Sequence, residues 1–313
     1  MKKCIYFVLI LSLLMLAVPA NAAETSDGDF AEVEQAPQFL QCEYDTRDIT
    51  SYVPSMQNEV IQSTWDLFPE QQVYEMSSTM TALSTGSGVS TRDIIGTSDF
   101  FDAHPISAPY SSIAYLRAYF DSNGDGATDY IMSTTGFLVS EKVLITSAQG
   151  VVPRDTSTTT LIELRIYFGM DSSSLSGASY LHPRRWTWST AWHDSSTSWK
   201  YDYCVIELWD EIERPFYFNC IESSNLATGQ NIYISGYPSA YNYYQKACHG
   251  QITSSNYYNC NFNNDMLTGM HGAPLYNNYC VGIATYRATT YNMGNLFTEH
   301  IYELICSKIS ENS

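Results

Sequence analysis

The stretch "DMLTGMHGAPLYN", residues 265–277, has the pattern of a tight turn that presents one reactive side chain. Gly269 and Gly272 flank the imidazole of His271, and a proline and an apolar run follow. Glycine lets a backbone turn sharply, so this pattern predicts a functional loop. The residue that the loop presents is a histidine, which could be a catalytic residue, a replacement for one, or a residue without a catalytic role.

Outward from this loop, the chain reads as short strands separated by turn-forming residues. Apolar and β-branched runs occupy residues 112–120, 129–139, 142–152, 160–168, 201–209, 231–238, 250–255, 273–277 and 279–287. Strands at this spacing, with few helical periods between them, predict an all-β barrel or sandwich.

The last part of the chain has a different period. Phe297, Ile301, Leu304 and Ile305 fall on one helical face, and Thr298 precedes them as a plausible N-cap. Residues 297–309 are therefore predicted to form a C-terminal helix that packs on the β domain.

The N-terminal region divides into two further segments. A basic start, an apolar run from Ile5 to Val18 and small residues at Ala20 and Ala22 predict a secretory signal peptide over residues 1–22. Residues 23–92 are acidic and rich in Gln, Ser and Thr, which is typical of an extension or pro-segment. The β domain is expected over residues 93–313, in a protein that is secreted.

Charge excludes two classes of partner. The formal net charge is -18 and the chain has only 15 Lys and Arg residues, whereas nucleic acids and anionic lipids require basic patches. No second apolar stretch of membrane-spanning length follows the signal peptide, so no membrane association is expected after its cleavage.

Cysteine usage fits export. Seven cysteines remain after signal removal, without a C-x-x-C pair, so disulfides are permissible and zinc is not indicated. Cys204 lies in an apolar strand and is expected to be a buried free thiol. Cys248 and Cys260 bracket two short strands and a turn, which makes them the candidate disulfide.

The stretch "DSNGDGATD", residues 121–129, resembles the first half of a calcium loop, with Gly126 at the turn. The candidate oxygen ligands are Asp121, Asn123, Asp125 and Asp129. Met132 occupies the twelfth position, where an EF-hand carries an acidic residue, so the loop is not an EF-hand. The alternative is an Asx-rich hairpin turn without a metal.

Several segments together resemble one known family. "DIIGTSD" (93–99), "TTGFLVSEKVLITSAQGVV" (134–152), "YDYCVIEL" (201–208), "ISGYP" (234–238) and the loop at 265–277 occur in the order and spacing of that family. The sequence resembles the trypsin-like serine peptidases, most of all the bacterial glutamyl endopeptidase branch. The resemblance covers residues 93–305 and implies two six-stranded β barrels with the active site between them.

The resemblance also assigns the catalytic positions. Gln149 stands where the family has its general-base histidine, and His271 stands where it has its nucleophilic serine. Asp202 matches the aspartate that orients the base. The backbone of Gly269, Met270 and His271 matches the family's oxyanion loop. Glutamate specificity is not supported, because Ala284 and Thr285 replace the branch's His-Thr pair.

The substitutions remove the family's chemistry. Serine-peptidase catalysis requires a hydroxyl activated by an imidazole that accepts and returns a proton. A glutamine amide does neither, so the chain is expected to be an inactive homologue that binds a peptide or protein ligand. An active serine endopeptidase with a different constellation and a structural or adhesive secreted protein are the alternatives.

Overall fold

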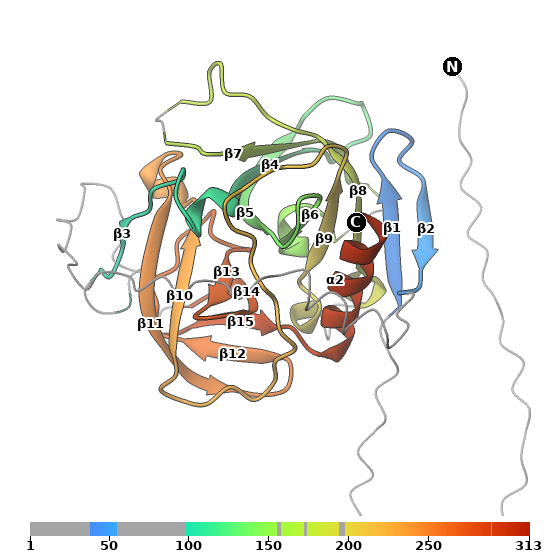
Figure 1. Ribbon diagram of the computed structural model, residues 1–313. Coiled ribbons are helices and arrows are strands. Elements are labelled where there is room, and N and C mark those ends of the chain that lie inside the picture. Colours follow the sequence, from blue (N-terminus) through green and yellow to red (C-terminus); the bar gives the residue numbers. More distant parts are fainter. Residues whose placement is uncertain are drawn as a thin grey trace, which may run out of the picture. The chain divides into compact units, whose positions relative to one another are not determined.

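The computed structural model describes residues 38–54, 95, 98–154, 158–171, 174–193, 198–288 and 290–313. These residues form two antiparallel β-sheets and a C-terminal helix (Figure 1). The expected signal peptide at 1–22 and the expected boundary at residue 92 lie outside the described residues. No helix among the described residues combines the length and apolarity that a membrane crossing requires.

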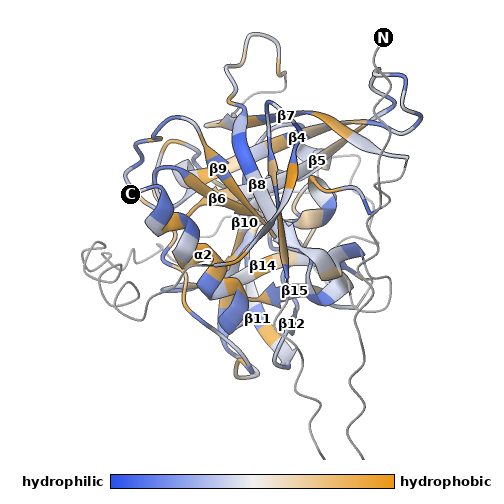
Figure 2. Ribbon diagram, turned by 90° about the vertical axis from the view of Figure 1, so that its right-hand side faces the viewer, coloured by the Kyte–Doolittle hydropathy of each residue, from blue (hydrophilic) through white to orange (hydrophobic). Residues whose placement is uncertain are grey.

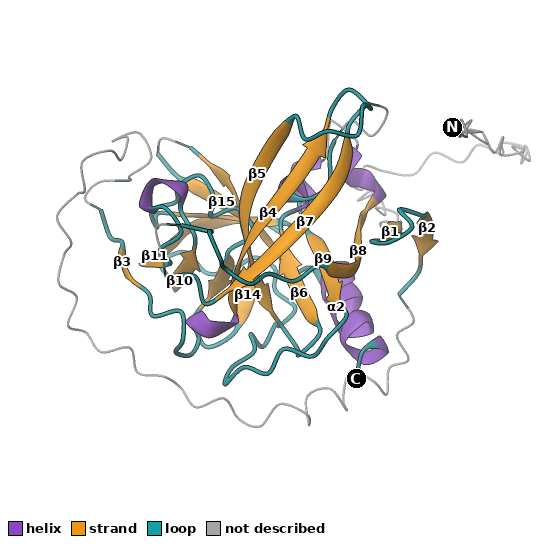
Figure 3. Cartoon of the chain, turned by 90° about the horizontal axis from the view of Figure 1, so that it is seen from above, coloured by secondary structure: helices purple, strands orange, loops and turns teal. Residues whose placement is uncertain are grey.

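The first sheet contains eight strands in the order β2-β1-β8-β9-β6-β5-β4-β7. Their bounds are β1 Phe39–Glu43, β2 Ile49–Tyr52, β4 Ile113–Asp121, β5 Tyr130–Leu138, β6 Val143–Thr146, β7 Thr160–Phe168, β8 Pro183–Ser189 and β9 Cys204–Leu208. Figure 3 shows β5, β4 and β7 as long strands side by side. A bridge between Ile166 of β7 and Leu181 brings β7 to the chain that leads into β8.

The second sheet has the order β10-β13-β14-β15-β12-β11-β3, and an additional pairing of β10 with β11 closes six of its strands into a barrel. Their bounds are β3 Phe101–Asp102, β10 Asn231–Gly236, β11 Lys246–Ser255, β12 Asn259–Phe262, β13 Pro274–Tyr276, β14 Cys280–Arg287 and β15 Asn292–Leu296. The predicted all-β architecture with a terminal helix is confirmed, with one closed six-stranded barrel and a second sheet of eight strands.

Alternation along β4 explains how the sheets pack. Leu116 and Phe120 point into the core of the first sheet, whereas Ile113 and Tyr115 belong to a second cluster that also contains Tyr276 of β13. Successive side chains of a strand face opposite sides, so one strand lines two cores. β6 and β9 are buried along their whole length, and Figure 2 colours both strands as strongly hydrophobic.

The C-terminal helix α2, Glu299–Glu311, confirms the prediction with a shift of two residues. Ile301, Leu304 and Ile305 are buried in the cluster shared by the two sheets. Thr298 occupies the N-cap position, but its side chain makes no capping hydrogen bond. Burial of the apolar face therefore positions the helix, without help from its cap.

Residues 39–52 of the predicted extension form a hairpin that continues the first sheet. β1 pairs antiparallel with β8 from Phe39 opposite Ser189 to Glu43 opposite Arg185. Phe39 and Cys42 are buried. The sequence analysis predicted no strand here, because the surrounding composition is polar and the partner strand lies more than a hundred residues away.

The seven cysteines that the structure describes are free thiols, and all of them are buried. Cys204 is buried as expected. The disulfide expected between Cys248 and Cys260 is absent, which corrects that prediction. β11 and β12 do form the expected hairpin, but Cys260 lies opposite Ser255, seven residues along β11 from Cys248. That is roughly 20 Å of strand, far beyond the span of a disulfide.

Candidate ligand site at the predicted catalytic positions

The general-base position lies in a turn directly after β6. A strand was expected to run through residue 152, but β6 ends at Thr146 and a 3-10 turn, Ala148–Gly150, carries Gln149. Asp202 precedes β9, and β6 pairs with β9 from Val143 opposite Glu207 to Thr146 opposite Cys204. Strand pairing therefore brings Gln149 and Asp202 together.

Gln149 and Asp202 form two hydrogen bonds. The backbone N–H of Gln149 donates to Asp202 Oδ1 at 2.7 Å, and its side-chain Nε2 donates to Oδ2 at 2.7 Å. Nε2 also donates to the carbonyl oxygen of Thr285 at 2.5 Å. An amide nitrogen has two hydrogens, so both are occupied.

Asp202 is 4% exposed. Burial raises the pKa of Asp202 to about 7, although the hydrogen bonds from Gln149 oppose the shift. The carboxyl group therefore titrates near neutral pH in the folded protein.

The turn that presents His271 depends on two glycines with positive φ. Gly269 has φ +97 and Gly272 has φ +79, a region that L side chains rarely adopt. A Cβ at Gly272 would lie 2.3 Å from the carbonyl oxygen of Thr135, and one at Gly269 would lie 2.4 Å from that of Tyr237. Backbone packs against both glycines, so the turn has one available shape.

The turn is fastened to β5. The carbonyl oxygen of His271 accepts hydrogen bonds from the Thr134 hydroxyl at 2.5 Å and from the Thr135 backbone N–H at 2.9 Å. The Thr135 hydroxyl donates to the Gly269 carbonyl at 2.8 Å. The first sheet thus holds the loop that the second sheet carries.

The imidazole of His271 is neutral at physiological pH. Burial, and after it the charge of Arg287, lowers the pKa of His271 to about 4. Within the described part of the chain, its ring forms no hydrogen bond, with Gln149, Asp202 or any other residue. His271 therefore makes no hydrogen bond to Asp202 in the described part of the chain.

Two backbone N–H groups of the same turn are unengaged. Met270 N–H donates to the Leu267 carbonyl at 3.0 Å, and Gly272 N–H donates to the Ala284 carbonyl at 2.7 Å. The N–H groups of Gly269 and His271 donate to no residue that the structure describes. This alternation leaves a pair of donors of the kind that binds a carbonyl oxygen.

A cavity of about 330 Å³ lies among β11, β12, β15 and Trp199, and Gln149, Asp202 and His271 are not among its lining residues. It is lined by Trp199, Ser254, Ser255, Asn256, Asn259, Asn261, Tyr291 and Met293. Trp199 is three residues from Asp202, and the Met293 carbonyl lies 3.5 Å from the Thr285 hydroxyl. None of these lining residues is charged, so the cavity suits a neutral polar group.

The predicted calcium loop does not fit a metal as it is placed. Asp121 accepts backbone N–H groups on both oxygens, from Asn123 and Gly124 on Oδ1 and from Gly126 on Oδ2, at 2.7–3.0 Å. Asp129 accepts from Ser122 and from the Asn123 amide in the same way. No cluster of three metal-binding side chains occurs among the described residues. The ligand oxygens serve the loop's own donors.

No protein-family model and no curated protein matches the sequence. Among solved structures, a Glu endopeptidase bound to MPD matches with a TM-score of 0.55 and 23% identity, over 70% of this chain and 98% of that one. The chain has the fold of the trypsin-like serine proteases. The two-barrel expectation drawn from the sequence resemblance is confirmed at this level.

Two further structures with this protease fold match over similar lengths. A scabies mite inactivated protease paralogue gives a TM-score of 0.53 and 13% identity, over 68% of this chain and 99% of that one. Human heparin binding protein matches with a TM-score of 0.50 and 11% identity, over 70% of this chain and 98% of that one. Identities this low establish the protease fold alone.

Gln149, Asp202 and the 269–271 turn were predicted from the sequence, but the contacts of the Thr285 carbonyl and of the Thr134 and Thr135 hydroxyls were not. The cavity next to Trp199 was not predicted either. Thr285 entered the prediction only as a position of the substrate pocket. Its carbonyl had no sequence signal, because any residue type supplies that acceptor.

Proposed function

We propose that this chain is a secreted protein of the trypsin-like protease fold that lacks peptidase activity and acts by binding an extended polypeptide. The observation that carries the proposal is the hydrogen bonding of Gln149. Its Nε2 donates both hydrogens, to Asp202 and to Thr285, and the side chain has no group that accepts a proton near neutral pH.

The rest of the turn supports the loss of activity. Acyl transfer in this fold begins when a hydroxyl oxygen, deprotonated by an imidazole, attacks a carbonyl carbon. Here the imidazole of His271 occupies the nucleophile position and no hydroxyl is presented there. Burial keeps that imidazole neutral, and no described carboxylate contacts it, so base and nucleophile are both missing.

Binding of a polypeptide requires hydrogen-bond donors and a cavity but no proton transfer, and both features are present. The unengaged N–H groups of Gly269 and His271 can donate to a backbone carbonyl of a ligand. The cavity among β11, β12 and β15 offers amide and hydroxyl groups beside the aromatic side chains of Trp199 and Tyr291. A net charge of -18 disfavours acidic ligands. A neutral or basic segment with polar side chains fits best.

The comparisons contain support for this proposal and for its alternative. A protein named an inactivated protease paralogue has the same fold, so the fold persists without the activity in that case. The match to a Glu endopeptidase favours the second candidate, an active serine endopeptidase with a different catalytic constellation. The third candidate, a structural or adhesive secreted protein, makes no use of the cavity.

A positional library of fluorescein-labelled octapeptides tests the proposal. We expect saturable anisotropy changes for neutral or basic peptides with Ser or Asn, and unchanged peptide masses after prolonged incubation. Trp199→Ala should weaken binding at least tenfold, because Trp199 lines the cavity and is 41% exposed. Trp209→Ala is the matched control, since Trp209 is 52% exposed and does not line the cavity.

The outcomes separate the three candidates. Cleavage of peptides by the purified chain would favour the endopeptidase. Absence of binding across the library would overturn the binding proposal and leave the structural protein. Equal losses in the two tryptophan variants would place the binding surface elsewhere.

A further inference from the structure

We propose that Cys220 and Cys280 are joined by a disulfide in the exported protein. The sequence analysis chose a different pair, and the basis for this one is the backbone register. Cys220 lies in the connector between β9 and β10, and Cys280 is the first residue of β14 (Figure 1).

The backbone holds the two cysteines directly beside each other. Cys220 and Cys280 form an isolated parallel β-bridge. Ile221 N–H donates to the Cys280 carbonyl at 3.1 Å, and Cys280 N–H donates to the Asn219 carbonyl at 2.9 Å. Neighbouring strands lie about 4.8 Å apart, inside the Cα separation of about 4.4–6.8 Å that a disulfide requires.

The side chains of Cys220 and Cys280 project to the same side of this bridge. Each thiol donates a weak hydrogen bond to a backbone carbonyl, from Cys220 to Phe218 at 3.9 Å and from Cys280 to Gly282 at 3.4 Å. The exposed fractions of the two residues are 7% and 1%. Paired partners in a bridge project side chains to the same side, so bond formation needs rotation about the Cα–Cβ bonds and no movement of the backbone.

The other described cysteines lack this register. Cys260 of β12 lies opposite Ser255, which is seven residues along β11 from Cys248. Cys42 of β1 is two strands away from β9, which carries Cys204. Cys306 of α2 is the third thiol near Cys220. It belongs to a helix, without backbone pairing to the connector, and its thiol interacts with the Tyr302 hydroxyl. Cys280 is therefore the partner that the fold provides.

The reaction is thiol–disulfide exchange with a small disulfide oxidant, such as oxidised glutathione, of the export compartment. One cysteine thiolate attacks the oxidant and releases one reduced thiol. The second thiolate attacks the mixed disulfide and releases the other. Two cysteine thiols lose two protons and two electrons, and the oxidant gains them as two thiols. Burial raises the pKa of Cys220 well above its ordinary value, so exchange precedes complete burial.

The bond would tie the connector to the barrel that carries the His271 turn. The closed loop runs from residue 220 to residue 280 and includes β10 to β13. A crosslink over a loop of this length constrains the unfolded chain strongly. The effect would be a second barrel that resists unfolding outside the cell.

Peptide mapping of the full chain, produced in an oxidising host or refolded with reduced and oxidised glutathione, tests the proposal. The chain is alkylated in denaturant without reductant, digested and analysed by mass spectrometry. We expect a linked peptide pair containing Cys220 and Cys280, with Cys204 and Cys260 alkylated as free thiols. Reduction should lower the melting temperature by roughly 5–10 °C.

Variants separate this bond from general effects of thiols. Cys280→Ser should remove the sensitivity of the melting temperature to reductant, whereas Cys260→Ser should retain it. Mapping of the unmodified chain stays decisive if Cys280→Ser does not fold. Alkylation of both Cys220 and Cys280, or a link from Cys220 to Cys306, would overturn the proposal.

Discussion

Nε2 of Gln149 lies 2.7 Å from Oδ2 of Asp202, at the positions where the family resemblance places a general base and its orienting carboxylate. An amide satisfies the buried carboxylate as a donor, so the local structure is maintained. A glutamine amide does not provide the proton transfer that an imidazole provides. This contact is therefore the basis of the proposal that the chain keeps the fold without peptidase activity.

The carboxyl group of Asp202 should make stability depend on pH. Burial raises the pKa of Asp202 from 3.8 to about 7, so the folded state holds this proton more tightly than the unfolded state. Its contribution is fully present below pH 4 and is lost as the pH rises to 7. Urea unfolding of the unmodified chain and Asp202→Asn should show their difference in unfolding free energy falling across this range, by on the order of 4 kcal/mol at most. A difference independent of pH would contradict the buried, titrating carboxyl.

Replacement of Gly272 by alanine should lower the unfolding free energy far more than the same replacement at a glycine with no neighbouring atoms. Gly272 and Gly177 have nearly equal φ, +79 and +78, but only Gly272 has backbone within reach of a Cβ, at 2.3 Å. Gly177→Ala should cost about 1 kcal/mol from backbone strain alone. Gly272→Ala should cost about 3 kcal/mol or more, since strain and overlap add. Equal costs by urea denaturation would mean that Thr135 does not fix the turn.

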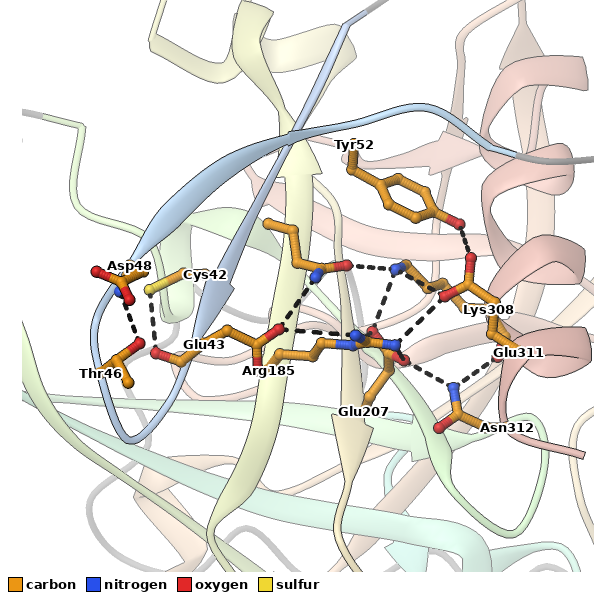
Figure 4. Close-up of polar contacts among 11 residues, drawn as sticks. Cys42, Glu43, Thr46, Asp48, Tyr52, Arg185, Glu207, Lys308, Glu311 and Asn312 are labelled. Atoms are coloured by element: carbon orange, nitrogen blue, oxygen red, sulfur yellow. Dashed lines mark hydrogen bonds and ion pairs between the residues drawn. The ribbon is translucent and has the colours of Figure 1, made fainter.

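The buried lysine of α2 should be a major source of stability. Figure 4 shows Lys308 and Arg185 meeting Glu207, with Lys308 Nζ 3.2 Å and Arg185 Nε 2.6 Å from the carboxylate. The Lys308 and Glu207 side chains are 0% exposed. Lys308→Met should cost about 3–5 kcal/mol, because a buried charge loses a partner.

The surface pair of Lys142 and Glu211 supplies the control for that measurement. Their nitrogen and oxygen lie 3.0 Å apart, but the side chains are 27% and 59% exposed. Lys142→Met should change the unfolding free energy by less than about 1 kcal/mol. A small effect at both lysines would show that the network in Figure 4 contributes little.

Calcium should leave the melting temperature unchanged. The oxygens of Asp121 and Asp129 already accept hydrogen bonds within the loop. These donors hold the pKa of Asp121 below its usual value, so Asp121→Ala should lower the melting temperature above pH 4, and the difference should shrink in acid. A rise of the melting temperature in millimolar Ca²⁺, reversed by EDTA, would instead support the calcium loop that the sequence suggested.

Local patterns and family spacing predicted most of the fold. The runs that became β4, β5, β7, β10 and β14 are long, apolar and β-branched, and the helix has a clear apolar face. β8 and β15 were not predicted, because polar residues such as Arg184 and Asn295 interrupt their apolar pattern. Those strands are specified by their partners in the sheets.

Long-range contacts limited the prediction of the site. The meeting of Gln149 with Asp202 followed from the family resemblance, but the acceptor at Thr285 is a backbone atom that sequence does not mark. Lys308 likewise reads as a surface residue of an amphipathic helix. Its burial depends on Glu207 and on Gln41 of the N-terminal hairpin, both far away in sequence.

The most direct test of the central claim is labelling by a fluorophosphonate probe, which reacts with an activated serine hydroxyl. Loss of triad members typically costs on the order of 10⁴ to 10⁶ in kcat and the members act as a unit. The unmodified chain, Gln149→His alone and His271→Ser alone should therefore not label above background. The double variant Q149H/H271S, with Asp202 in place, should label, and Asp202→Ala should abolish that labelling. Strong labelling and proteolysis by the unmodified chain, lost in Asp202→Ala, would contradict the account.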